Sequence, residues 1–320
     1  MTEHKKADLS KIKTIKASDR KTMADKRGQA KVFDCQESFG RFLKSLPDYL
    51  KATEFLDTAS RISAAKRANK SLIWMMGAHP IKVGLTPIII DLIESGFITH
   101  VALNGAGAIH DLEMAFFGRT SEEVSDGLSD GSFGMVEETP RLFFEAVKMA
   151  IAENLGLGEG LGKFIAQQSP KFAEHSILNA CHEKGIPATV HVAIGTDTIS
   201  QHPCFDGAAL GRLSQDDFLI LCESVAGLTR GVVLNIGSAV IMPEVFLKAL
   251  TVARNIHGAV ENFLAVNLDM IQHYRPNTNV VTRPVAGGGT GYSFTGHHEI
   301  MIPLLAAAIK ELYRASAGKG

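Results

Sequence analysis

The chain has 320 residues, of which 45% are apolar and 21% are charged, and its formal net charge is −1. This balance is typical of an ordinary globular protein and excludes a largely disordered chain. A charge so close to zero gives no support for nucleic acid or an anionic membrane as the main partner. No stretch reaches the ~18 uninterrupted apolar residues of a membrane-spanning helix, so we expect a soluble, cytoplasmic protein.

Cysteine and histidine usage argues against a disulfide framework and against a dedicated metal site. The four cysteines show no CxxC spacing, and the twelve histidines are scattered and form no HExxH pattern. These features fit reduced thiols in a cytosolic protein better than disulfides or a zinc site. The sequence therefore predicts no bound metal.

The first part of the chain differs from the rest in charge. Residues 1–32 contain ten Lys and Arg against four Asp and Glu, a local net charge of +6, with few large apolar residues. We expect residues 1–34 to form a mobile, solvated tail, because so few apolar residues cannot build a core. The acids and the lack of an apolar run are untypical of a transit or signal peptide. Residues 35–69 then predict a helical arm of one or two amphipathic helices, broken near Pro47.

From Ser71 onward, short apolar runs alternate with segments of helix length. The predicted strands are 72–78, 98–104, 188–195, 232–239, 263–268 and 279–285. Strands that are apolar on both faces and alternate with amphipathic helices are typical of a parallel sheet covered on both sides. We predict a single doubly wound, Rossmann-like α/β domain over residues 35–320, including the helical arm. Ligands of such folds bind beyond the carboxyl ends of the strands, near the point where the strand order reverses.

One predicted strand end, "HVALNGAGAIHD" at residues 100–111, combines small residues with ionisable ones. Its "GAGAIH" is close to the dinucleotide pattern G-x-G-x-x-G but has His110 in place of the third glycine, so the match is weak by itself. Gly105 and Gly107 would let backbone N–H groups approach a pyrophosphate, and the start of the following helix favours an anion. Asp111 completes a His/Asp pair on the predicted substrate side.

A second glycine-rich run, "AGGGTG" at residues 286–291, would offer a similar backbone cradle after the last strand. The alternative is a flexible loop. Among the strand-end histidines, we expect the adjacent pair His297 and His298, just before the last helix, to contact a ligand.

Carboxylates also gather at or just after the predicted strand ends. They are Asp111, Glu113, Asp197, Asp269 and Glu299. A cleft with several acids suits a cationic substrate or the ribose hydroxyls of a nucleotide. Each acid could instead cap the helix that follows it.

In the order of these loops, residues 70–315 resemble deoxyhypusine synthase and its bacterial relatives. The matching stretches are "GAGAIHD", "IPATVHVAIGTDTIS", "NIGSAV", "NLD" and "HHEIMIPLL". Their common order, rather than any one of them, carries the resemblance. It implies NAD as the cofactor, a homotetramer with sites between subunits, and transfer of an aminobutyl group from a small cationic amine.

Matched position by position, the resemblance places cofactor contacts on Ala106, Gly107, Asp197, Gly237, Ser238 and Asn267. We add Gly105 from the glycine loop and Asp269 from the strand-end acids. On the amine side it places Asp111 and His202. His110 or His202 would serve as the base, because an imidazole pKa near ~6.5 suits proton transfer at neutral pH. We prefer His202, because the resemblance places an amine-contacting acid at its position. The carboxylates at 111 and 197 would then face each other across the nicotinamide end of the cleft.

One departure from the family concerns its catalytic lysine. The family forms an enzyme–imine on a lysine of a Trp-Gly-Lys triplet, whereas this chain reads "VVTRPV" there and has no lysine between Lys248 and Lys310. Arg283 cannot replace it, because a guanidinium stays protonated. Lys82 is the only lysine that we place near the cleft. Burial would lower its pKa, as in Schiff-base lysines, and an ordinary surface lysine is the alternative.

Three functions follow from these observations. The first is an NAD-dependent transferase or oxidoreductase acting on a polyamine or diamine, for example in homospermidine formation, and not true deoxyhypusine synthesis. The second is a cyclodeaminase or lyase that recycles NAD and acts on an amino acid such as ornithine. The third is a nucleotide-binding protein without catalysis.

Overall fold

A computed structural model describes residues 4–317, and the chain divides into two compact units that meet between Thr53 and Glu54. The first unit contains helix α1 (Phe39–Ser45) and the beginning of helix α2 (Leu50–Arg67), so the predicted break near Pro47 is confirmed. Before α1 the backbone is largely extended, and every residue from 4 to 27 is exposed. Three short 3-10 turns interrupt this stretch: Leu9–Lys11, Ala17–Asp19 and Lys26–Gly28.

The second unit is built on a six-stranded sheet in which every neighbouring pair is parallel. The strands are β1 (Leu72–Met76), β2 (His100–Asn104), β3 (Ala188–His191), β4 (Val232–Ile236), β5 (Leu264–Asp269) and β6 (Thr290–Thr295). Their order is β3-β2-β1-β4-β5-β6, which reverses direction between β1 and β4. This is the strand order of the doubly wound dinucleotide-binding fold, so the predicted fold class is confirmed.

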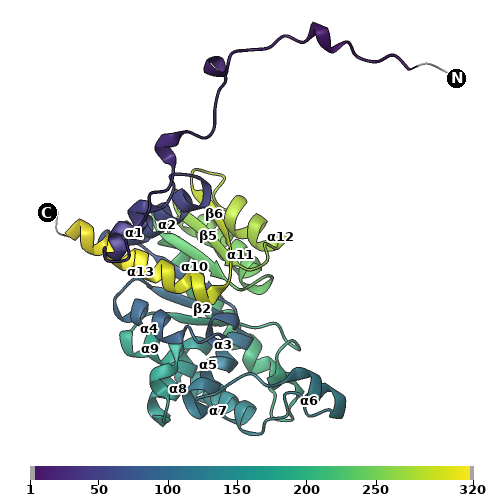
Figure 1. Ribbon diagram of the computed structural model, residues 1–320. Helices are drawn as coiled ribbons and strands as arrows, with labels where there is room; N and C mark the ends of the chain where they lie inside the picture. Colours follow the sequence, from purple (N-terminus) through teal and green to yellow (C-terminus); the bar gives the residue numbers. More distant parts are fainter. Residues whose placement is uncertain (1–3, 318–320) are drawn as a thin grey trace. The chain divides into compact units, whose positions relative to one another are not determined.

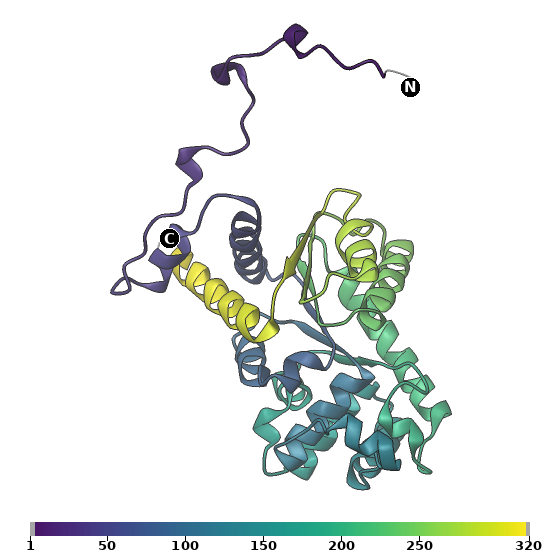
Figure 2. The ribbon, with the colours of Figure 1, turned by 45° about the vertical axis from the view of Figure 1, so that its right-hand side comes forward.

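Helices cover both faces of the sheet (Figures 1 and 2). The longer ones are α4 (Thr86–Glu94), α5 (Gly105–Phe117), α7 (Glu138–Glu153), α8 (Leu157–Gln168), α9 (Ile177–Lys184), α10 (Gly207–Ala226), α11 (Ile241–His257) and α13 (His298–Ala317). The short ones are α3 (His79–Lys82), α6 (Val124–Asp130) and α12 (Tyr274–Pro276). Ile73 and Met75 of β1 pack in one apolar core with side chains of α10 and α11. Alternate residues of the strands therefore pack against opposite helical layers.

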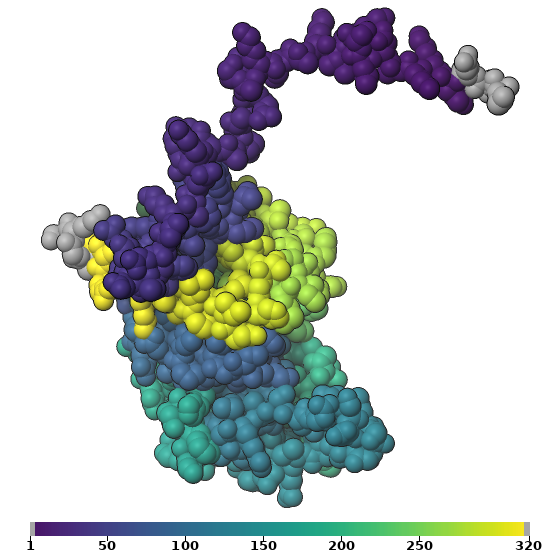
Figure 3. Space-filling model, viewed as in Figure 1, coloured from purple at the N-terminus to yellow at the C-terminus, as the bar shows by residue number. Residues whose placement is uncertain are grey.

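The other layer includes α4 and α13, which lie side by side on the surface in Figure 3. Lys310 of α13 forms an ion pair with Asp91 of α4. Within residues 4–317, no helix combines the length and the apolar character that crossing a membrane requires.

The prediction of a strand at residues 279–285 is wrong. The chain forms a π-helical turn at Asn277–Thr282, and the last strand is β6 at Thr290–Thr295. Val280 of that turn is fully buried, which explains why the segment is apolar. The sequence therefore showed correctly that the segment is inside, but apolar character alone does not separate a short buried strand from a helical turn.

Because the last strand is β6, the glycine run at residues 286–291 lies at a different edge of the sheet from the predicted one. It precedes β6 and therefore lies at the amino end of that strand, away from the edge where ligands bind. A Cβ atom at Gly291 would lie 1.9 Å from the carbonyl oxygen of Val281, so the glycine permits close backbone packing. The predicted second cradle is wrong, and the carboxyl end of β6 leads instead to His297 and His298.

Candidate functional site

The point where the strand order reverses is lined by two glycines. Gly77 follows β1 and Gly237 follows β4, and a Cβ atom at Gly77 would lie 2.3 Å from the carbonyl oxygen of Gly237. Gly237 has a φ of +63°, a left-handed conformation that favours glycine. Backbone atoms rather than side chains therefore form this part of the carboxyl edge.

Two histidines meet beside these glycines. The Nδ1 atoms of His79 and His298 lie 2.8 Å apart, and Nε2 of His298 lies 3.0 Å from the carbonyl oxygen of Leu268. A carbonyl oxygen only accepts, so neutral His298 donates from Nε2 and accepts at Nδ1. His79 then donates from Nδ1 and keeps Nε2 as an acceptor. Burial, followed by the neighbouring His298, lowers the pKa of His79, which keeps that ring neutral.

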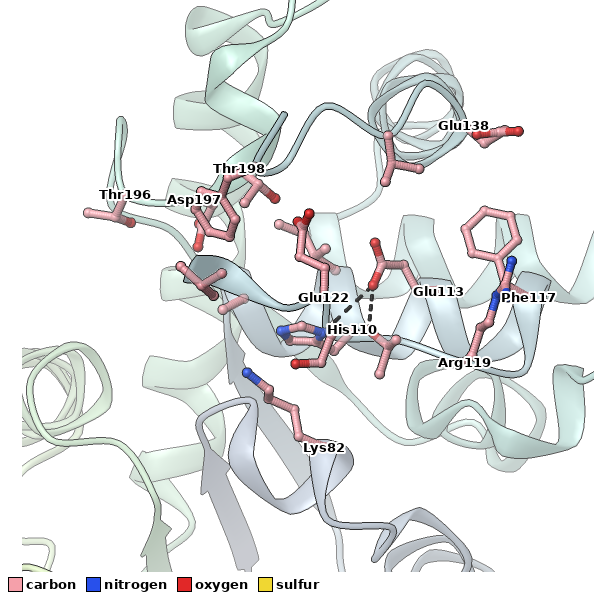
Figure 4. A pocket seen from close by; sticks show the side chains of 17 residues that line it. Lys82, His110, Glu113, Phe117, Arg119, Glu122, Glu138, Thr196, Asp197 and Thr198 are labelled. Atoms are coloured by element: carbon pink, nitrogen blue, oxygen red, sulfur yellow. Dashed lines mark hydrogen bonds and ion pairs between the residues drawn. The ribbon is translucent and has the colours of Figure 1, made fainter. Parts of the chain in front are cut away.

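A cavity of about 510 Å³ lies beyond the carboxyl ends of β1, β2 and β3 (Figure 4). Short helix α3, helix α5 and the loop after β3 supply its inner wall, and residues 119–138 supply the rest. Its ionisable residues are Lys82, His110, Glu113, Arg119, Glu122, Glu138 and Asp197. Four predicted site residues thus come together here: Lys82, Ala106, His110 and Asp197.

His110 is held by a hydrogen-bonded chain that ends on a carboxylate. The Thr120 hydroxyl donates to Oε2 of Glu113, and the His110 Nδ1 lies 2.5 Å from that hydroxyl oxygen. Because the hydroxyl hydrogen is used on Glu113, Nδ1 of His110 is the donor and Nε2 remains an acceptor. Thr139 donates to the other oxygen of Glu113 at 2.8 Å. His110 and Glu113 lie one helical turn apart on α5, so their spacing of three was visible in the sequence, whereas Thr120 was not predicted.

The Glu113 carboxyl is ionised in this arrangement. Burial by itself raises its pKa, but the nearby His110 and the hydrogen bonds from Thr120 and Thr139 outweigh burial and leave the pKa lowered. The carboxylate lies 3.7 Å from Nδ1 of His110. A negative charge at this distance stabilises the imidazolium form of His110 when it takes up a proton.

Asp197 presents a carboxylate to the same cavity. Within the described residues 4–317 we find no hydrogen bond or ion pair to it, and burial raises its pKa to about 6, against a smaller lowering by His110. A Cβ atom at Gly105 would lie 2.0 Å from its Oδ2 atom. Asp197 therefore sits directly against the first residue of α5, half-buried and available to a ligand.

Asp111 does not face this cavity, so its predicted pairing with Asp197 is wrong. Its side chain is completely buried and accepts hydrogen bonds from the Ser176 hydroxyl at 2.6 Å, the Ile177 N–H at 2.7 Å and the Leu178 N–H at 3.1 Å. The carboxylate caps the start of α9, on a side of α5 that faces away from the cavity. Burial raises its pKa to about 6 despite these bonds.

Several predicted cofactor contacts are engaged within the protein instead. The Gly107 N–H donates to the Asn104 side chain at 2.8 Å, so it is not free for a pyrophosphate. The Asn267 side chain is buried, accepts from Asn235 at 2.8 Å and donates to Gln272 at 2.8 Å. These two predicted NAD contacts do not fit the geometry, because their polar groups already have partners.

The remaining cofactor candidates lie around β4 and β5. Ser238 is buried, and its hydroxyl accepts from the Met242 N–H at 3.2 Å, at the start of α11. The Asp269 carboxylate accepts from the Met270 N–H at 2.8 Å at the end of β5. The Gly237 N–H donates to the Leu268 carbonyl oxygen at 3.2 Å, so this predicted cofactor contact also has a partner within the protein.

His202 and Lys82 also differ from their predicted settings. His202 Nε2 lies 2.7 Å from the Gly134 carbonyl oxygen, so this ring supports the cavity rim and does not line the cavity. Lys82 does line it, but the side chain is exposed. The burial that would make Lys82 a Schiff-base lysine is absent.

All four cysteines are free. Within the described residues 4–317, no three His, Cys, Asp or Glu side chains are grouped so that they could hold a metal ion.

Comparison with known proteins shows the fold. No protein-family profile matches the chain, and no curated protein matches it. A candidate LOR/SDH protein from Methanococcus maripaludis S2 is similar with a TM-score of 0.50 and 16% identity, over 83% of this chain and 71% of that one. A candidate deoxyhypusine synthase from Entamoeba histolytica is similar with a TM-score of 0.52 and 11% identity, over 88% of this chain and 96% of that one.

A third similar structure is AgrE in a ternary complex with ornithine and NAD+. Its TM-score is 0.52 at 13% identity, over 82% of this chain and 33% of that one. The chain thus spans about a third of AgrE, and likewise of the cyanobacterial arginine dihydrolase ArgZ, of which it covers 34%. At these identities the comparisons establish a shared Rossmann-like fold.

Proposed function

We propose that the protein is an NAD-dependent enzyme that oxidises a small amine-bearing substrate in the His110 cavity. The observation that carries this proposal is the juxtaposition of two groups. Asp197 offers an unpaired carboxylate, and His110 offers an acceptor nitrogen whose tautomer is fixed by Thr120 and Glu113. A carboxylate that binds an ammonium group beside a base is what amine oxidation requires.

The strand order and the glycines support NAD at the carboxyl edge. The reversal of the strand order between β1 and β4 is where ligands of this fold bind, and Gly77 and Gly237 pack closely there without adding a side chain to that edge. Ala106 would contact its nicotinamide end, while the engaged polar groups of Gly107 and Asn267 would not take part. NAD, when bound, supplies an acceptor for the hydride that leaves the carbon next to nitrogen.

The protein's own groups handle the proton. An alkylammonium bound at Asp197 must lose one N–H proton before the adjacent C–H bond can give up its hydrogen as hydride. Nε2 of His110 accepts that proton, and the imidazolium that results donates through Thr120 toward the negative Glu113. The substrate is left as a protonated imine, two electrons more oxidised, with the one released proton on His110.

Two fates of such an imine match the functions that the sequence suggests. Attack by a second amine gives aminobutyl-type transfer, which the resemblance to deoxyhypusine synthase implies together with a cytoplasmic homotetramer. Loss of ammonia with ring closure gives a cyclodeaminase, and this second function is favoured by the shared fold of AgrE in complex with ornithine and NAD+.

The test is binding and turnover with purified protein. Calorimetry should detect NAD binding, and Gly237→Val should abolish it because valine cannot adopt the left-handed backbone. A panel of polyamines, diamines and diamino acids is then screened for NADH absorbance. Asp197→Asn should remove activity at unchanged NAD affinity, while Glu223→Gln, an exposed acid on α10, should have no effect. Absence of NAD binding in the wild-type protein would overturn the proposal.

A further inference from the structure

Two cations in the cavity have no partner. Lys82 and Arg119 line the same space as four carboxylates, yet among the described residues neither forms an ion pair or a hydrogen bond through its side chain. By contrast, Lys248 on α11 is paired with Glu244 one turn away. The cavity therefore keeps free positive charge next to free negative charge.

Two of the four neighbouring carboxylates are already engaged in hydrogen bonds. Glu113 accepts from the hydroxyls of Thr120 and Thr139, and Glu122 accepts from the Gly134 N–H at 2.9 Å. Asp197 is the half-buried carboxylate that remains beside His110. Glu138, the fourth acid, is exposed at the start of α7. A ligand bound beside His110 therefore meets an available carboxylate at Asp197 and an available ammonium group at Lys82 of α3.

The position of Lys82 is fixed by a rigid turn. Its neighbours Pro80 and Ile81 are buried, and the Val83 N–H closes the turn on the His79 carbonyl oxygen at 3.1 Å. Gly84, with a φ of +78°, then redirects the chain. Figure 4 shows the Lys82 amino group pointing toward His110. The fold thus presents this one charged side chain of α3 to the cavity.

We propose that the substrate is a free amino acid, with its ammonium group at Asp197 and its carboxylate at Lys82. This inference rests on the proposed function and names the substrate class of that site. A carboxylate pairs with the Lys82 ammonium, whereas a polyamine carries only positive charges and would place one of them against it. Opposite charges on both sides of His110 therefore select a zwitterion over a diamine.

Matched ligand pairs test the selection. L-Ornithine and putrescine differ by the carboxylate alone, as do L-lysine and cadaverine. Binding of each is measured by calorimetry with NAD present. We expect the wild-type protein to bind the amino acid of at least one pair about tenfold or more tightly than its diamine, which corresponds to about 1.4 kcal/mol.

Variants of Lys82 test whether this residue causes the preference for the amino acid over the diamine. Lys82→Gln should lose it, Lys82→Arg should retain most of it, and Lys148→Gln, which removes an exposed charge on α7 outside the cavity, should leave it unchanged. Equal binding of amino acid and diamine, or a preference that survives Lys82→Gln, would overturn the zwitterion assignment while leaving the proposed amine oxidation intact. If no pair binds in the presence of bound NAD, both proposals are wrong.

Discussion

Gly105 and Asp197 are in contact across two strand ends: a Cβ atom on residue 105 would lie 2.0 Å from the Oδ2 atom of Asp197. The small residues after β2 therefore make room for a carboxylate of the same chain. In the sequence the same glycine was assigned to a pyrophosphate. A pyrophosphate at this position would meet that carboxylate, so the contact argues against the predicted role of Gly105.

This contact predicts that Gly105→Ala weakens amine binding but hardly changes the stability of the fold. The clashing atom is the end of an Asp side chain that can rotate away, and alanine is a better helix former than glycine. The free energy of unfolding should change by less than about 1 kcal/mol, whereas amine affinity should fall about tenfold as Asp197 is displaced. Urea titration and calorimetry measure the two quantities.

Gly158→Ala is the matched control, because its Cβ atom would meet backbone. It would lie 2.2 Å from the carbonyl oxygen of Ala188 and 2.8 Å from the amide nitrogen of Thr189. Here we expect destabilisation of about 1–3 kcal/mol or more. Unchanged amine binding in a folded Gly105→Ala protein would show that Asp197 does not hold the amine.

The fold was largely predictable from the sequence, and the prediction was wrong only for the last strand. The apolar runs that alternate with helical segments correctly predicted strands β1 to β5. Parallel strands that are buried on both faces appear in a sequence as continuous apolar segments. Residues 277–282 share that character, since Val280 is buried, but they form a helical turn. The true last strand, 290–295, is mostly half-exposed and contains Gly291, so its pattern is weak.

The site was predictable in part. His110, Asp197 and Lys82 were expected because they follow strands, and parallel strands bring their carboxyl ends to one edge. Asp111 was misplaced because a helix turns its successive side chains by about 100°, so adjacent residues face different partners. The contacts of Thr120 with Glu113, and of His79 with His298, join segments whose approach depends on the tertiary structure. No spacing in the sequence indicates either one.

Thr120→Val should slow turnover without weakening substrate binding. Valine keeps the shape of threonine but cannot link His110 to Glu113, so the imidazolium loses part of its stabilisation. We expect kcat to fall about tenfold at a similar KM, against about 100-fold for His110→Gln. The matched variant Thr139→Val removes the other hydroxyl on Glu113 and should preserve most of kcat. Equal losses in both threonine variants would argue against the relay.

Deletion of residues 1–30 should leave the melting temperature within about 4 °C of the full-length value. Every described residue from 4 to 27 is exposed, and the hydrogen bonds that would be lost include those of Asp25 with Tyr49 and of Gly28 with Asp48. Differential scanning calorimetry measures the change. A larger drop, or an altered mass by light scattering, would show that this segment contributes to folding or assembly.

The buried acid Asp217 predicts that stability falls as the pH rises from about 4 to 8. Its Oδ2 atom accepts from the Gly158 and Val190 N–H groups, its Oδ1 atom is buried without a partner in the described chain, and burial raises its pKa to about 8. The folded protein therefore keeps a proton that the unfolded chain releases near pH 4. Stability falls as pH rises toward 8, by up to about 1.4 kcal/mol per pH unit, and levels off above it.

The range from pH 6.5 to 8 separates the contribution of Asp217 to stability from the contributions of the other buried groups. Asp111 has a pKa of about 6 and contributes in the same direction at lower pH, whereas His100 and His191, with pKa values lowered by burial to about 3 and 4, act oppositely below pH 6.5. Between pH 6.5 and 8 the urea midpoint of the wild-type protein should fall, while that of Asp217→Asn, which cannot ionise, should stay nearly constant. Parallel pH curves for the two proteins would mean that Asp217 is not protonated in the folded state.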